Sequence, residues 1–129
     1  MPEKLSWTCS VRVDNGPQIT ATASLQVDGY DKQKILMPKA GAAGAKPVKV
    51  SLAPPGAGQL QVIVINPVKP DAKLQYKAGN RTVVLDGPHL LIGAGAADLL
   101  AALSTDLVFE NATGADAEVD ILFGYRLKA

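Results

Sequence analysis

The sequence has few of the side chains that catalytic and metal sites require. Its 129 residues include one histidine, one cysteine and six aromatic residues. Because Cys9 is alone, no intrachain disulfide can form, and any Ser-His-Asp triad or Cys-His pair has to use His89. The HExxH, GxSxG, paired CxxC and P-loop motifs are missing. We therefore expect a protein that is not an enzyme and has no catalytic residues, no metal ligands and no cofactor.

The sequence also has almost no net charge and no long apolar run. A formal net charge of +1 removes the main electrostatic attraction to nucleic acid or to an anionic membrane. No run is long enough to span a bilayer. The first ten residues contain neither the apolar stretch nor the cleavage site of a signal peptide. We expect no nucleic-acid partner, no membrane partner, and a location in the cytoplasm or in a particle assembled there.

What the sequence does have is enough apolar residues for a globular core. Hydrophobic residues make up 47% of the chain and charged residues 19%, which is the composition of a folded protein rather than a disordered one. The length is typical of one domain, so we expect a single domain over 1–129.

Two alternating segments flank the turn sequence DNGP at 14–17. Apolar side chains occupy the odd positions of 5–13 and again of 19–27. A period of two indicates strands that each bury one face. A three-residue loop over 15–17 would pair Val13 with Ile19 and Trp7 with Leu25, so that apolar faces match across a hairpin. We expect Trp7 and Leu25 to be buried cross-strand neighbours.

Shorter apolar runs follow, separated by glycine and proline turns. They cover 34–38, 48–53, 60–66, 72–77, 81–86, 89–93, 106–111 and 117–127. Many short strands with this punctuation favour an all-β fold. We expect an antiparallel β-sandwich, jelly-roll-like, of eight to ten short strands with one short helix. The run 117–127 is expected to pair with 106–111 through the turn at 112–116.

The stretch HLLIGAGAADLL, residues 89–100, has nearly the outline of a dinucleotide-binding βαβ unit. Asp98 occupies the position of the third glycine, where a carboxylate would repel pyrophosphate. The helix that follows, Ala96 to about Leu103, is too short to cross over a parallel sheet. We expect no nucleotide here. Instead Asp98 caps a short helix that closes one end of the sandwich with Leu99 and Leu100 on its apolar side.

Opposite charges are separated along the chain. From 31 to 81 nine bases face two acids, a formal +7, and from 82 to 120 seven acids face no base, a formal −7. Either the fold interleaves the two segments, or the basic face of one copy meets the acidic face of the next. The second alternative makes Lys73, Lys77, Glu118 and Asp120 candidate interface residues.

Two loop features have alternative interpretations. The small-residue tract 38–47 is either a mobile surface loop or an arm that orders against a neighbouring subunit. Asp14, Asp28 and Asp31 either form ordinary turns or supply oxygen ligands for calcium, although their spacing matches no EF-hand.

These absences and patterns favour a non-enzymatic structural subunit that self-assembles, such as a component of a phage or virus particle or another protein shell. The expected partner is then a second copy of the chain. One alternative is a carbohydrate- or peptide-binding β-sandwich module that uses Trp7, Tyr30 or Tyr76. A second is an enzyme built on His89 and the loop at Gly93.

Overall fold

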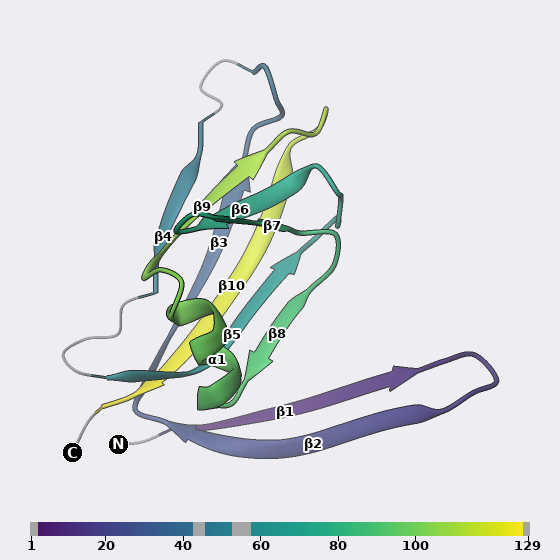
Figure 1. Ribbon diagram of the computed structural model, residues 1–129, viewed down its shortest axis with the longest axis vertical. Helices are drawn as coiled ribbons and strands as arrows, with labels where there is room; N and C mark the ends of the chain where they lie inside the picture. The colour runs from purple at the N-terminus through teal and green to yellow at the C-terminus, as the bar shows by residue number, and fades with distance from the viewer. Residues whose placement is uncertain (1–2, 43–45, 53–57, 128–129) are drawn as a thin grey trace.

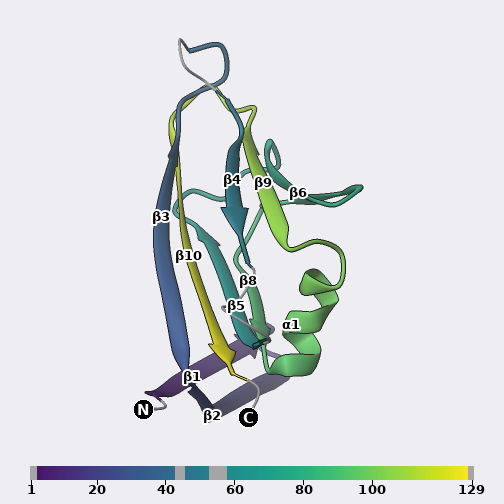
Figure 2. The ribbon, with the colours of Figure 1, turned by 90° about the vertical axis from the view of Figure 1, so that its left-hand side faces the viewer.

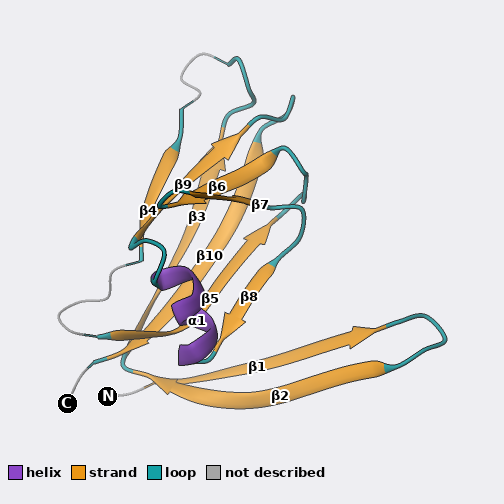
Figure 3. Ribbon diagram, viewed as in Figure 1, coloured by secondary structure: helices purple, strands orange, loops and turns teal. Residues whose placement is uncertain are grey.

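The computed structural model describes residues 3–42, 46–52 and 58–127. Within these ranges the chain forms ten strands and one short helix (Figures 1 and 3). The elements are β1 (Glu3–Arg12), β2 (Gln18–Val27), β3 (Gly29–Met37), β4 (Val48–Ser51), β5 (Gln59–Pro67), β6 (Leu74–Ala78), β7 (Arg81–Val84), β8 (His89–Ile92), α1 (Ala94–Ala101), β9 (Asp106–Asn111) and β10 (Ala117–Arg126).

Eight of these strands form two antiparallel sheets that pack face to face. The larger sheet has the order β3-β10-β5-β8 and the smaller one β4-β9-β6-β7. Figure 2 shows the two layers from the side, with the β1–β2 hairpin running out beneath them. The predicted all-β sandwich is therefore confirmed.

The chain builds this sandwich by folding back on itself. Strands β3 to β6 run out, and β7 to β10 return as their antiparallel partners in the pairs β3–β10, β4–β9, β5–β8 and β6–β7. Successive pairs alternate between the two sheets. β6 and β7 are joined by a short turn, and the strands of the other three pairs lie progressively farther apart in the sequence.

The core lies between the inner faces of the two sheets. Val119 and Ile121 of β10 are fully buried opposite Tyr76 and Phe109 of the smaller sheet. No polar or charged residue is fully buried among the described residues. Because each buried large apolar side chain contributes about 1.5–3 kcal/mol, this layer is the main source of stability.

The expected pairing of 106–111 with 117–127 is wrong. β9 and β10 are consecutive, yet they lie in different sheets. Asn111, at the end of β9, donates from Nδ2 to the carbonyls of Pro38 at 3.1 Å and Ala115 at 2.9 Å. These bonds tie the end of β9 to the turn and to the segment after β3, which directs the chain from one sheet to the other.

The helix begins two residues earlier than expected, and Asp98 does not cap it. α1 follows Gly93, whose φ is 101° and which makes no side-chain capping bond, while Asp98 lies exposed within the helix. The Gly93 amide donates to the Gln61 carbonyl at 2.7 Å, so β5 fixes the place where the helix starts. Leu100 is buried against the core as predicted, but Leu99 is 72% exposed.

Gly79, in the turn between β6 and β7, is required by the backbone. Its φ is +63°, and a Cβ there would lie 2.8 Å from the carbonyl oxygen of Leu103. We expect Gly79→Ala to lower the free energy of unfolding by about 1–3 kcal/mol, because it combines a left-handed backbone with a clash. Gly87→Ala is the matched control, since a Cβ added to Gly87 would have no other atom within 4 Å.

We expect Gly87→Ala to change stability by less than about 0.5 kcal/mol in urea denaturation. Equal losses for the two variants would contradict the role of the Gly79 turn.

Candidate interaction surface

The β1–β2 hairpin, called the arm from here on, projects away from the sandwich (Figure 1). Its register pairs Trp7 with Ala23 and Val11 with Ile19. The expected register, Trp7 opposite Leu25, is wrong by two residues. The Val13 amide donates to the Pro17 carbonyl at 3.0 Å, so the turn covers 14–16 instead of the expected 15–17. The shift is even, so the apolar side chains of both strands still share one face.

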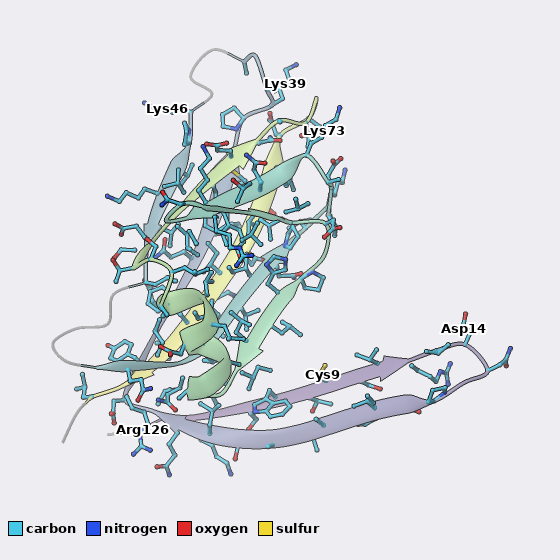
Figure 4. The ribbon with its side chains drawn as sticks, in the orientation of Figure 1. Cys9, Asp14, Lys39, Lys46, Lys73 and Arg126 are labelled. Atoms are coloured by element: carbon cyan, nitrogen blue, oxygen red, sulfur yellow. The ribbon has the colours of Figure 1, made fainter. Side chains whose placement is uncertain are left out.

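No second layer covers this apolar face among the described residues. Val11, Val13 and Ile19 are 62%, 61% and 75% exposed. Trp7 and Leu25 are only half-buried, so the expectation that they belong to the core is wrong. Figure 4 shows the Cys9 side chain on the side of the arm that faces the sandwich, and Asp14 at the tip.

The opposite face of the arm is polar, and its charged side chains lie only near the two ends, at Lys4 and Arg12. The Thr8 and Thr22 hydroxyls lie 2.9 Å apart, and Gln18 donates from Nε2 to Ser10 Oγ at 3.1 Å. Residues 5–11 and 18–27 contain no charged side chain. Edge strands of soluble proteins are normally protected by charges, prolines or bulges, and the arm has none of these over the same residues.

The larger sheet also has an apolar face that the smaller sheet does not cover. On this outer face Leu122 of β10 lies beside Val64 of β5, which lies beside Leu90 of β8. Leu90 is 46% exposed. A solvated sheet face normally carries polar residues at these positions. The signal in the sequence was the unbroken apolar runs of β5 and β8, which fit burial on both faces.

The arm starts from the lower end of this outer face. Val27, the last residue of β2, is buried there, and a Cβ on Gly124 would lie 2.9 Å from Val27 Cγ1. Gly124 therefore leaves the space into which the root of the arm packs. The two uncovered apolar surfaces of the molecule are adjacent at this point.

A hollow of about 590 Å³ lies at the opposite end of the sandwich, between the end of β3, the β5–β6 connection and the β9–β10 turn. Leu36, Met37, Val68 and Leu74 line it, with Lys69 among the charged residues at its rim. Its described lining includes no aromatic side chain, so it offers no surface on which a sugar ring stacks.

The candidate interface residues do not form one patch. Lys77 of β6 pairs with Glu110 of β9 at 3.6 Å, and Glu118 of β10 pairs with Lys34 of β3 at 3.9 Å. The fold thus interleaves part of the basic segment with part of the acidic one. Such exposed pairs contribute about 0–1 kcal/mol each.

The other two candidates lie apart from each other. Lys73 is exposed at the end of the sandwich away from the arm, near Lys39 and Lys46 (Figure 4). Asp120 is half-buried, and its Oδ1 has no hydrogen-bond partner among the described residues. It shares the outer face with Lys34 and Asn66, its neighbours across β3 and β5.

His89 has one described side-chain partner, the hydroxyl of Tyr76, 2.9 Å from Nδ1. The two rings meet edge to face between the sheets, with centroids 5.7 Å apart. Tyr76 is 2% exposed, which removes it from the candidate ligand-binding aromatics. Burial raises the pKa of Tyr76 to about 12. The pair packs the core, and no described carboxylate completes a catalytic triad with it.

Two of the three candidate calcium ligands accept hydrogen bonds from within the chain. Asp28 Oδ2 accepts from the Leu127 amide at 2.6 Å, and Asp31 Oδ2 accepts from Gln33 Nε2 at 2.9 Å. In the described parts of the chain no group of three or more His, Cys, Asp or Glu side chains is placed to hold a metal ion. No described helix is long and apolar enough to cross a membrane. Part of the tract 38–47, residues 43–45, lies outside the described residues.

Comparison with known proteins finds no relative from which a function could be inferred: no family model, no curated protein and no solved structure matches the chain. The arm and the outer face of the larger sheet are therefore the features of this chain that indicate an interaction surface.

The raised pKa of Tyr76 predicts a loss of stability at high pH. Between pH 10 and 12 the unfolded chain loses the phenol proton while the folded chain keeps it, so the free energy of unfolding falls as pH rises. We expect this group to contribute on the order of 2–3 kcal/mol of that loss, and none of it below pH 10. Urea denaturation between pH 8 and pH 12 measures it.

Tyr76→Phe should remove this component, and Tyr30→Phe is the control because Tyr30 is 55% exposed. If wild type and Tyr76→Phe lose stability with the same slope above pH 10, the buried phenol is not the cause.

Proposed function

We propose that this protein is a non-enzymatic structural subunit that assembles with copies of itself, as in a phage or virus particle or another protein shell formed in the cytoplasm. The observation that carries the proposal is the arm, a two-stranded ribbon that has no charged residue over 5–11 and 18–27 and whose apolar face is open.

An arm of this kind is not stable by itself. A two-stranded hairpin in water is marginal, and stable sheets need a third strand or a packed apolar face. Here the exposed Val11, Val13 and Ile19 leave that requirement unmet within one copy. Each gains about 1.5–3 kcal/mol when it is fully buried, so covering the face strongly favours association.

The strand order supports the comparison with shell proteins. We propose that the sandwich is a jelly roll, because eight strands pair as an out-and-back ribbon that alternates between two four-stranded sheets. Jelly rolls build viral capsids, and they also form lectin domains. A jelly roll alone does not distinguish assembly from ligand binding, and the open apolar face of the arm favours assembly.

The ligand-binding alternative has less support. Of its three aromatic residues Tyr76 is buried and Trp7 is half-buried, which leaves the exposed Tyr30. A single exposed ring without a neighbouring aromatic is a weak platform for a sugar or peptide.

Light scattering tests the proposal. The wild-type mass should exceed the 13.4 kDa of one chain. The double variant Val11→Ser/Ile19→Thr should weaken association about a hundredfold, since it removes two apolar contacts worth more than about 1.4 kcal/mol each. Leu99→Ser is the matched control, because Leu99 is 72% exposed on α1, and it should change nothing.

Salt separates the two possible contacts. An apolar arm contact should persist in 1 M salt, whereas contacts led by Lys73 and Lys77 with Glu118 and Asp120 should weaken as the screening length falls from about 10 Å to about 3 Å. A wild-type mass of one chain at every salt and protein concentration would contradict self-assembly.

A further inference from the structure

Two apolar surfaces of this chain have no cover among the described residues: the arm face and the outer face of the larger sheet. The arm face includes Val11 and Ile19, and the outer face includes Leu122, Val64 and Leu90. We propose that they cover each other across copies, so that the arm of one copy lies on the outer face of a second copy and two copies exchange arms reciprocally. This inference rests on the proposed self-assembly and names its contact surface.

The two surfaces match in length. Each strand of the arm has ten residues, and β10, which runs along the middle of the outer face, also has ten. At about 3.3 Å per residue, both extend about 33 Å. An arm laid beside β10, over β5 and β8, therefore reaches from the lower end of the sheet to the exposed Val68, which follows β5 at the far end.

The surfaces also match in charge. Residues 5–11 and 18–27 of the arm carry no charge, and neither β5 nor β8 contains Asp, Glu, Lys or Arg. The charged residues of the outer face lie on the two strands at its other side, with Lys32 and Lys34 on β3 and Glu118 and Asp120 on β10. An arm over β5 and β8 therefore buries apolar groups without removing a charge from water, which would cost several kcal/mol.

The area of contact favours two arms over one. A ribbon about 33 Å long and about 10 Å wide covers about 330 Å², or about 650 Å² counted on both partners. That is below the roughly 1,000 Å² of a specific interface, whereas two exchanged arms bury about 1,300 Å² and fall in the standard range. Reciprocal exchange gives a closed two-fold dimer.

The native Cys9, on the apolar face of the arm, provides a crosslinking probe. Wild-type chains are mixed with Cys9→Ser/Leu90→Cys or Cys9→Ser/Leu122→Cys chains that carry a size tag, under mild oxidation. A disulfide requires Cβ atoms about 4 Å apart, so it reports direct contact. Cys9→Ser/Leu99→Cys is the matched control, because Leu99 is exposed on α1 outside the proposed contact.

At least one outer-face variant should give about tenfold or more heterodimer than the control, since contact raises the effective thiol concentration to the millimolar range. Mixed chains exclude an arm that folds back on its own sheet. Light scattering of the untagged wild-type protein should give about 27 kDa, twice the mass of one chain. In a second measurement without cysteines added, Leu90→Lys should weaken the dimer at least tenfold and Leu99→Lys should not.

The outcomes separate this inference from the proposed function. Assembly with no heterodimer above the control would overturn the docking of arm on sheet and leave self-assembly standing. Dominant wild-type Cys9–Cys9 dimers would mean that arms pair with each other, which also overturns it. A mass of one chain for wild type would overturn both proposals.

Discussion

The apolar face of a strand needs a second layer of protein, and the rest of this structure depends on how that requirement is met. Eight strands meet it within the chain, because the inner faces of two sheets cover each other around Ile121 and Phe109. The arm does not meet it, and neither does the outer face of the larger sheet. The stability of the sandwich thus arises from this interaction inside the chain, and the proposed assembly uses the same interaction between chains.

Much of the fold follows from the alternation of apolar residues in the sequence. Apolar residues at every second position share one face of a strand. The structure confirms this alternation in the arm and in β10, where Val119 and Ile121 are buried. Alternation does not say which sheet a strand joins, so β9 and β10 were wrongly paired. The missing information was a set of side-chain bonds from Asn111 that no periodicity encodes.

The register of the arm and the start of α1 show a second limit. Both depend on single backbone bonds at a turn: the Val13 amide to the Pro17 carbonyl, and the Gly93 amide to the Gln61 carbonyl. The second bond joins residues far apart in sequence. Parity survived the register shift because an even slip keeps every side chain on its face. Burial of Trp7 did not follow, since burial depends on whether another layer exists above the face.

The charges illustrate why linear patterns are weak guides to surfaces. The basic and acidic segments are separate in sequence, yet antiparallel pairing sets Lys77 beside Glu110 and Lys34 beside Glu118. The surfaces that no other described part of the chain covers are apolar. Charge is almost absent from the arm and from β5 and β8, where a monomeric protein would place it to keep strands from associating.

That lack of protection is informative because unprotected edges and faces expose a protein to unselective aggregation. Unprotected edges and faces give a specific contact when the partner surface has the same length and also lacks charge. The matched contact then buries more area than a chance contact does. The ten-residue strands of the arm match the ten-residue β10 in length, and β5 and β8 beside β10 carry no Asp, Glu, Lys or Arg. The apolar surfaces that lack a cover within one chain are therefore the surfaces on which the proposed assembly depends.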